Sequence, residues 1–164
     1  MKILIMYATK YGFSEKCVKL LKDELNGEIK IINISGNSEI DLSKYDKIII
    51  GGPIYMGIMN KEIVRFCNEN IELLKTKQIG LFVCSMFSGI RAEENMKKAF
   101  PDELKNIAVS IKLFGGELNT DKMNFVDKFI TKMVGKMPLQ PGESINKGIL
   151  INNVSNLAKD INNC

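Results

Sequence analysis

Apolar runs rich in isoleucine and valine recur along the chain, separated by segments in which apolar residues follow a helical spacing. The apolar residues within each run are continuous rather than alternating with polar ones. This is typical of strands that are buried on both faces of a parallel sheet. Five runs of this kind predict strands, at Ile3–Tyr7, Ile29–Ile34, Lys47–Ile50, Ile79–Cys84 and Val109–Phe114.

Between these runs, apolar residues spaced by three or four positions predict helices. Four segments have this pattern, Ser14–Leu25, Lys61–Leu74, Arg91–Phe100 and Val154–Ile161. Pro101 indicates a stop after the third helix, and the short polar connection at 35–46 argues against a full helix there. The alternation predicts an α/β fold with a doubly wound parallel sheet and helices on both faces. No repeat or linker divides the chain, so residues 1–164 are expected to form a single domain.

Composition narrows the class of protein. Hydrophobic residues make up 45% of the chain and charged residues 26%, which is ordinary for a soluble globular protein. The net charge is +4 and the basic residues are spread out, so no nucleic-acid partner is expected. The first apolar run is six residues long, too short for a signal-peptide core. No run approaches the roughly 18 residues that span a bilayer. We therefore expect a cytoplasmic location.

The side chains offer few catalytic groups. The chain has no histidine, which excludes Ser-His and Cys-His nucleophile systems. Its four cysteines, Cys17, Cys67, Cys84 and Cys164, contain no CxxC pair, so neither a structural metal nor a disulfide framework is expected. If the protein is an enzyme, we expect a cofactor rather than a catalytic side chain to supply the chemistry.

The loop "YATKYGFSEK" follows the first predicted strand and opens the first predicted helix. In doubly wound sheets, ligands bind beyond the carboxyl ends of the strands. A helix that begins near Phe13 or Ser14 presents backbone N–H groups and its positive dipole end to an anion. Thr9 and Ser14 add hydroxyl donors, and Gly12 permits close approach of the backbone. An ordinary helix cap is the alternative. The spacing matches neither the dinucleotide nor the P-loop fingerprint.

Two further loops follow predicted strands. In "GGPIYMG", residues 51–57, Pro53 favours a rigid turn, and Tyr55 is suited to stack on a planar ligand; a plain surface turn is the alternative. In "CSMFSGI", residues 84–90, Met86 and Phe87 stand between serines and a glycine, a setting too polar for simple core. A phosphate cradle beside apolar loops fits a phosphorylated, flat aromatic molecule.

The pattern Thr9-x-x-Gly12-x-Ser14 and the two later loops resemble those of flavodoxins. The resemblance implies FMN as cofactor and a five-stranded parallel sheet in the order 2-1-3-4-5. It implies that the phosphate is surrounded by Thr9, Lys10, Tyr11, Gly12, Phe13 and Ser14. It implies that one side of the flavin ring is bordered by Pro53, Ile54, Tyr55, Met56 and Gly57. The other side is then bordered by Ser85, Met86, Phe87, Ser88 and Gly89.

Other features depart from flavodoxins. This chain is basic and lacks tryptophan, which disfavours a shuttle that docks on basic partners. An insertion at about 119–144 resembles the flavodoxin-like branch that contains menaquinone-dependent protoporphyrinogen IX dehydrogenase. That resemblance implies an FMN-dependent oxidoreductase acting on a quinone or porphyrinogen.

Two alternative functions are an electron carrier without its own substrate and a flavin-free scaffold domain. A redox partner protein or a small-molecule electron donor or acceptor is expected.

The insertion contains a predicted basic amphipathic helix within 122–137. Its apolar positions are Met123, Val126, Phe129, Ile130, Met133, Val134 and Met137, and its basic positions are Lys122, Lys128, Lys132 and Lys136. Such a helix suits peripheral contact with a membrane or with a partner. The alternative is that its apolar face packs over the sheet or the flavin pocket. A methionine-rich face also suits a flat hydrophobic ligand. The pattern does not indicate an oligomeric state.

Overall fold

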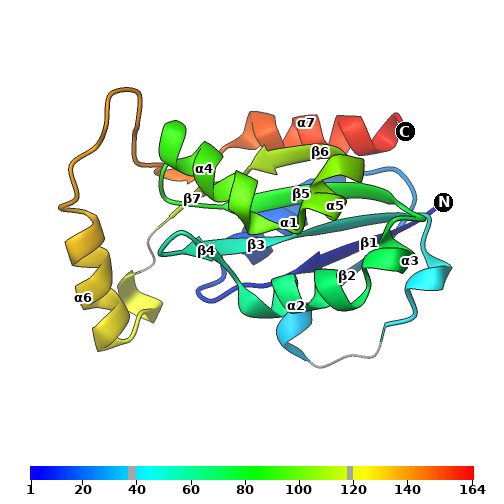
Figure 1. Cartoon of the computed structure of the whole chain (residues 1–164), viewed down its shortest axis with the longest axis horizontal. Helices are drawn as coiled ribbons and strands as arrows, with labels where there is room; N and C mark the ends of the chain where they lie inside the picture. Colours follow the sequence, from blue (N-terminus) through cyan, green and yellow to red (C-terminus); the bar gives the residue numbers. More distant parts are fainter. Residues whose placement is uncertain (37–39, 118–119) are drawn as a thin grey trace.

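A computed structural model describes residues 1–36, 40–117 and 120–164 and contains a central sheet of parallel strands (Figure 1). The sheet order is β2-β1-β3-β5-β6. The strands are β1 (Lys2–Tyr7), β2 (Glu28–Asn33), β3 (Lys47–Tyr55), β5 (Gln78–Cys84) and β6 (Ala108–Leu113). Numbered by themselves, these five strands have the order 2-1-3-4-5. The predicted α/β fold class and strand order are therefore confirmed.

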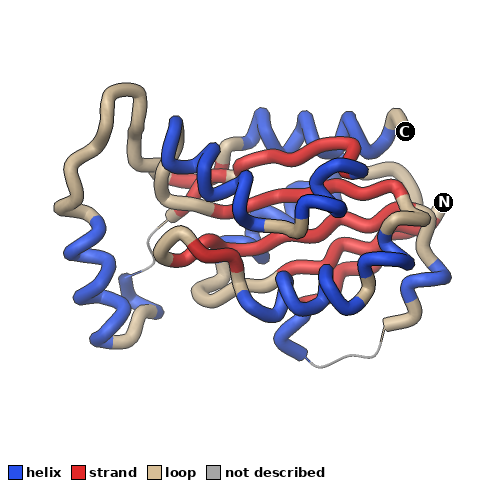
Figure 2. The backbone as a smooth tube through the Cα atoms, viewed as in Figure 1, coloured by secondary structure: helices blue, strands red, loops and turns tan. Residues whose placement is uncertain are grey.

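Helices cover both faces of this sheet (Figure 2). Residues of β1, β3 and β5 alternate between two apolar clusters, as the pleat of a doubly covered sheet requires. One face packs against α1 (Phe13–Glu24) and α7 (Ile151–Asn162). The other packs against α2 (Lys61–Glu69), α3 (Ile71–Leu74), α4 (Ile90–Ala99) and α5 (Asp102–Ile107).

The structure corrects the predicted elements at two places. The helix expected at Lys61–Leu74 is two helices, because Asn70 leaves helical geometry and its side-chain amide donates a 2.9 Å hydrogen bond to the carbonyl of Phe66. The helix α5 was not expected, since Pro101, the predicted stop, also stands at the start of a new helix. The polar connection at 35–46 holds only the short 3₁₀ turns Ile34–Gly36 and Leu42–Lys44 in its described part.

The third strand is longer than the pattern predicts. It continues from Ile50 through Gly51, Gly52 and Pro53 to Tyr55, so the proline is part of the strand and not of a turn. A Cβ on Gly51 would lie 2.3 Å from the carbonyl oxygen of Phe82, so this close approach needs glycine. The turn lies instead at residues 56–57, where φ is 50° and 79°, and leads into the short strand β4 (Ile58–Met59).

The insertion lies at the end of the molecule opposite to both chain termini (Figure 1). It runs from β7 (Gly115–Gly116) through the 3₁₀ turn Thr120–Lys122 and α6 (Phe125–Val134) to β8 (Gly148–Ile149), which pairs with β7. The predicted inserted helix is thus present over ten residues, while position 119 of the predicted insertion lies outside the described residues. Across the described residues, none of the helices combines the length and apolar content needed to cross a bilayer.

Candidate functional site

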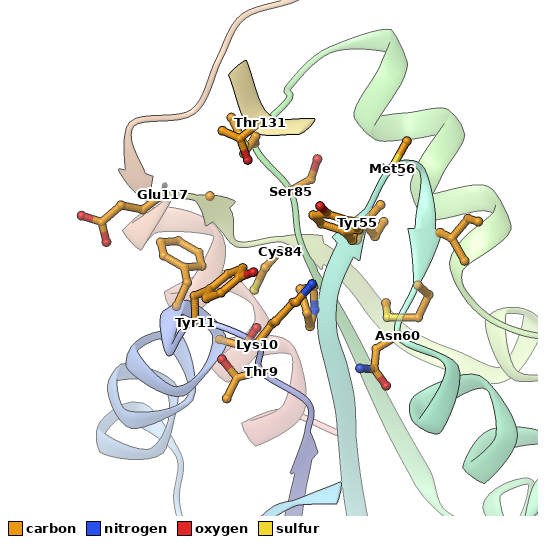
Figure 3. Close-up of a pocket in the computed structure, with 18 of the residues that line it drawn as sticks. Thr9, Lys10, Tyr11, Tyr55, Met56, Asn60, Cys84, Ser85, Glu117 and Thr131 are labelled. Atoms are coloured by element: carbon orange, nitrogen blue, oxygen red, sulfur yellow. The ribbon is translucent and has the colours of Figure 1, made fainter. Parts of the chain in front are cut away.

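A cavity of about 470 Å³ lies beyond the carboxyl ends of β1, β3 and β5 (Figure 3). We refer to it as the main cavity. Its volume is in the range that holds a small organic ligand. Eleven of the residues predicted for the cofactor line it, namely Thr9, Lys10, Tyr11, Phe13, Ser14, Pro53, Ile54, Tyr55, Met56, Ser85 and Met86. The fold therefore gathers three loops that are far apart in the sequence around one space.

A second cavity of about 330 Å³ adjoins the main cavity, and we call it the side cavity. The two share six residues, Ile54, Tyr55, Met56, Ser85, Met86 and Thr131. The side cavity adds two predicted residues, Gly57 and Phe87, together with Arg91, Asn95 and Met137. Its wall is mostly apolar, and its polar residues include Ser85, Thr131, Arg91 and Asn95. The side cavity is thus suited to an apolar molecule beside whatever the main cavity holds.

Three predicted residues line neither cavity. Gly12 shapes the first loop with a φ of 88°, and its N–H donates a 2.9 Å hydrogen bond to the hydroxyl of Thr9. Ser88 and Gly89 are held against the insertion instead. The N–H of Ser88 donates to the carbonyl of Ser144 at 2.9 Å, and a Cβ on Gly89 would lie 2.3 Å from the carbonyl oxygen of Gly142. These two residues therefore position the loop rather than line the cavity.

The amino end of α1 has the features of an anion site. Gly12 is the residue before the helix, and no side chain of the described chain caps the helix there. The hydroxyl of Ser14, in a residue only 1% exposed, has no hydrogen-bond partner among the described residues. A buried hydroxyl without a partner costs about 1–3 kcal/mol. The alternative that Ser14 is an ordinary cap is wrong, and its hydroxyl can bond to an anion beside the helix N–H groups.

A buried carboxylate joins the insertion to the first two loops. Asp127 of α6 is 5% exposed and accepts hydrogen bonds from the hydroxyls of Tyr11 and Tyr55, the latter at 2.9 Å. The ammonium of Lys10 lies 2.8 Å from the same carboxylate and 4.6 Å from the centre of the Tyr55 ring. The side chain of Asn124 caps α6 by accepting from the Asp127 N–H at 2.8 Å. We call Lys10, Tyr11, Tyr55 and Asp127 the Asp127 cluster. It fixes α6 across the main cavity.

The return segment of the insertion holds the loop after β5. The guanidinium of Arg91 forms a 3.0 Å ion pair with Glu143 and lies 4.4 Å from the centre of the Phe87 ring. The side-chain amide of Asn146 donates to the carbonyls of Ser85 and Phe87 at 2.9 and 3.1 Å. The insertion therefore contacts all three cavity loops and completes the wall that the sheet leaves open.

Sequence reasoning missed part of the lining. Residues of the main cavity that it did not assign to a site are Ile58, Met59, Asn60, Lys61, Cys84, Gly116, Glu117, Met123 and Thr131. The small-residue stretch "FGGELN" after the fifth predicted strand was a signal for Gly116 and Glu117. Asp127 is the one acidic residue between 122 and 137, and a lone carboxylate in a basic helix was its signal. Nothing in the sequence marks Asn60 and Lys61, which reach the cavity because β4 folds back on β3.

Two buried cysteines, Cys17 and Cys84, lie near the cavity. Cys84 lines the main cavity, and a hydrogen bond between the thiols of Cys17 and Cys84, together with burial, raises the pKa of Cys17 far above its usual value. A thiol of raised pKa is neutral near pH 7 and is a weak nucleophile. The Cys17 thiol is thus poorly suited to act as a nucleophile. Within 1–36, 40–117 and 120–164, no group of three metal-ligating side chains comes together.

A family model described as a flavodoxin domain matches residues 4–144 of this chain. The match covers most of the sequence, including all three cavity loops and the insertion through Ser144. A search of curated protein sequences finds no match.

Solved structures share the fold at low sequence identity. A Fusobacterium nucleatum flavodoxin bound to flavin mononucleotide has a TM-score of 0.52 at 14% identity, covering 98% of this chain and 96% of that chain. An oxidised flavodoxin 1 from Bacillus cereus has a TM-score of 0.52 at 15% identity, covering 84% and 100%. The Giardia intestinalis flavodiiron protein has a TM-score of 0.53 at 15% identity, covering 97% of this chain and 36% of that chain. This chain thus spans about a third of the flavodiiron protein.

Proposed function

The chain belongs to the flavodoxin domain family, and we propose that it is an electron-transfer flavoprotein that binds FMN in the main cavity. Family membership and the FMN-bound Fusobacterium nucleatum relative both point to FMN, which agrees with the cofactor predicted from the sequence. The observation that carries the proposal is the buried hydroxyl of Ser14 at the amino end of α1, which has no hydrogen-bond partner in the part of the chain that the structure describes.

The residues at that end fit a phosphate. α1 begins after a left-handed turn at Gly12, and no described side chain caps its first N–H groups. The dipole of a twelve-residue helix favours an anion at this amino end. The ammonium of Lys122 lies 3.7 Å from the position that a Cβ on Gly12 would take, so it adds positive charge beside the turn. Ser14, the α1 N–H groups and Lys122 would therefore hold the phosphate.

The opposite part of the main cavity fits a flat ring. Its walls come from Tyr55 and Met56 on one loop and Met86 on another, and polarizable side chains of this kind pack well on aromatic surfaces. FMN, when bound, supplies one- and two-electron transfer at its ring. The Asp127 cluster fixes Tyr55 in place, so this wall is set before any ligand arrives.

We further propose that the electron acceptor or donor is a small apolar molecule, a quinone or a porphyrinogen, that occupies the side cavity. The support is that this cavity shares six lining residues with the main cavity and is mostly apolar. Its polar groups, Arg91 and Asn95, would orient an oxygen-bearing substituent. The competing function is that of an electron carrier which passes electrons to a redox partner protein and has no substrate of its own.

Kinetics separates these two functions. The FMN-loaded protein is mixed with increasing concentrations of substrate. It is used in the reduced form with a water-soluble quinone, which accepts electrons, and in the oxidised form with a porphyrinogen, which donates them. An enzyme with a substrate site gives a rate that saturates, and the variant Asn95→Phe, which fills the side cavity, raises the half-saturating concentration at least tenfold. The matched variant Asn163→Phe, at an exposed position near the end of the chain, leaves that concentration unchanged. A rate that rises linearly with substrate concentration, and that is the same in the Asn95→Phe variant, supports the carrier function.

A further inference from the structure

The inserted helix α6 turns its apolar side chains outward. Phe125, Phe129 and Met133 are 86%, 60% and 58% exposed, whereas Asp127 on the opposite side is nearly buried. The alternative that the apolar face packs over the sheet or the flavin pocket is therefore wrong for Phe129 and Met133, whereas Met123 of that face is buried and lines the main cavity. The reason is the Asp127 cluster, which draws the polar side of the helix inward. The side chains of Ile130 and Val134, from the same predicted face, lie outside the described part of the structure.

These exposed residues form one continuous stripe. Phe125, Phe129 and Met133 follow one another at intervals of four, which places them in a row along α6, and Val126 borders the row. Met137 lies three residues beyond the end of the helix. We call these five residues the outer stripe. All five are more than half exposed. Large apolar side chains gathered in this way on a surface mark an interaction site.

A row of lysines borders the outer stripe. Lys128, Lys132 and Lys136 also follow at intervals of four, and they form no ion pair within the described residues. The helix contains one acidic residue, Asp127, whose charge is engaged by Lys10 on the inner side. The solvent-facing side of α6 therefore carries positive charge and apolar groups, without a negative charge of its own.

The combination of exposed apolar side chains and lysines on α6 favours some binding partners over others. A second copy of the chain, docked through the same stripe, would bring two rows of lysines together, which like-charge repulsion opposes. A bilayer with anionic headgroups offers negative charge at its surface and apolar material a few ångströms below it. With ten residues, α6 is about 15 Å long and lies on a bilayer rather than across it.

We propose that the outer stripe of α6 docks on the surface of an anionic lipid bilayer, with Phe125 and Phe129 in the headgroup region and the lysine row on the lipid phosphates. This docking does not depend on the flavin chemistry proposed above. Docking would bring both cavities close to the membrane, because Met123 and Thr131 of the same insertion line the main cavity and Met137 lines the side cavity. A docked protein has the walls of both cavities at the lipid surface.

Vesicle sedimentation tests the docking. The full-length protein is mixed with vesicles of phosphatidylcholine alone or of phosphatidylcholine with about 30% phosphatidylglycerol, whose anionic headgroups attract lysines near the surface. We expect binding to the anionic vesicles only, and its loss in high salt. The triple variant Lys128→Glu, Lys132→Glu, Lys136→Glu lowers the partition coefficient by about 100-fold, since each lysine contributes roughly fivefold.

A control variant with the same change of charge is Lys30→Glu, Lys98→Glu, Lys159→Glu, at exposed lysines outside the insertion, and it keeps most of the binding. A second variant, Phe125→Ser with Phe129→Ser, abolishes binding even in low salt. Far-UV circular dichroism shows that each variant is folded. Absence of binding by the wild-type protein contradicts the proposal, as does equal loss in both triple variants. Sedimentation velocity gives a further test. If the protein dimerises and the variant Phe125→Ser with Phe129→Ser does not, the outer stripe binds a second copy of the chain and the membrane proposal is overturned.

Discussion

The hydroxyl of Tyr55 donates a 2.9 Å hydrogen bond to Oδ1 of Asp127 and so joins the end of β3 to the inserted helix α6. Tyr55 was predicted to border the ring of a planar cofactor, and Asp127 was not singled out by the sequence pattern. Their contact shows that the insertion is part of the cavity wall and not an appendage. It also explains why α6 presents its polar side to the sheet and its apolar side to solvent.

Removing the carboxylate at Asp127 should loosen α6. Hydrogen bonds to charged groups are worth about 1.5–3 kcal/mol, so Asp127→Ala lowers the free energy of local opening by at least that amount. We expect hydrogen exchange of the α6 amides to accelerate by about 10- to 100-fold while exchange in β1 and β3 stays slow. Asp121→Ala, at an exposed acid of the same insertion, is the control. Unchanged exchange in Asp127→Ala refutes the role of the cluster.

The hydroxyl of Ser14 should have opposite effects on stability and on affinity. In the ligand-free protein it is buried without a partner among the described residues, so Ser14→Ala leaves the free energy of unfolding unchanged or raises it by up to about 1 kcal/mol. Affinity for FMN falls by about 10- to 100-fold, because a hydrogen bond to a charged phosphate is lost.

The matched control for Ser14 is Ser88→Ala. Ser88 was predicted to contact the flavin, but its hydroxyl lies 2.5 Å from that of Ser144 and it lines neither cavity. We expect its removal to leave FMN affinity within twofold of wild type. Urea unfolding and fluorescence titration measure the two quantities. A stability loss above 1 kcal/mol in Ser14→Ala would show that its hydroxyl has a protein partner.

Gly89 should not tolerate a side chain. Its φ of 72° with a ψ of −151° lies in a region that only glycine adopts readily, and the backbone of Gly142 fills the space beside it. Gly89→Ala is therefore expected to lower the free energy of unfolding by about 2–3 kcal/mol. Gly36→Ala, where no atom of the described residues lies within 4 Å of the added carbon, changes it by less than about 0.5 kcal/mol. Equal stabilities of the two variants in urea contradict this account of the loop.

Thiol chemistry should distinguish one cysteine from the other three. Cys164 is exposed, while Cys17, Cys67 and Cys84 are buried. Burial raises the pKa of Cys67 to about 12, so this thiol stays protonated from pH 7 to pH 9. Ellman's reagent is expected to modify one thiol per chain rapidly over this range, and the Cys164→Ser variant to lose the rapid phase. Rapid modification of a second thiol in the native protein contradicts the burial of the other three.

The sheet was predictable because each of its strands is a run of apolar residues long enough to be recognised locally. The first loop was predictable for a similar reason, since Thr9, Gly12 and Ser14 are close in sequence and their chemistry does not depend on distant parts. The extension of β3 was not predictable, because Gly51 and Pro53 read as a turn until the close approach of Phe82 is known.

The insertion was the hardest part to predict. Its helical periodicity predicted the right element but left two orientations open, since an apolar face can pack inward or contact a membrane or partner. The deciding interaction is that of Asp127 with Lys10, Tyr11 and Tyr55. In the sequence, Tyr11 lies 116 residues from Asp127 and Tyr55 lies 72 residues from it. Contacts at such separation leave no local pattern. Asn60 and Lys61 escaped notice for the same reason, because β4 brings them to the cavity.

The central claim is that the main cavity binds FMN by its phosphate and its ring together. Its most direct test is a titration of the ligand-free protein, followed by flavin fluorescence, with FMN and in parallel with riboflavin, which lacks the phosphate. We predict one FMN bound per chain, and riboflavin bound at least about 100-fold more weakly because it leaves the Ser14 hydroxyl and the α1 N–H groups without an anion. Failure to bind FMN, or equal affinity for the two flavins, would contradict the claim.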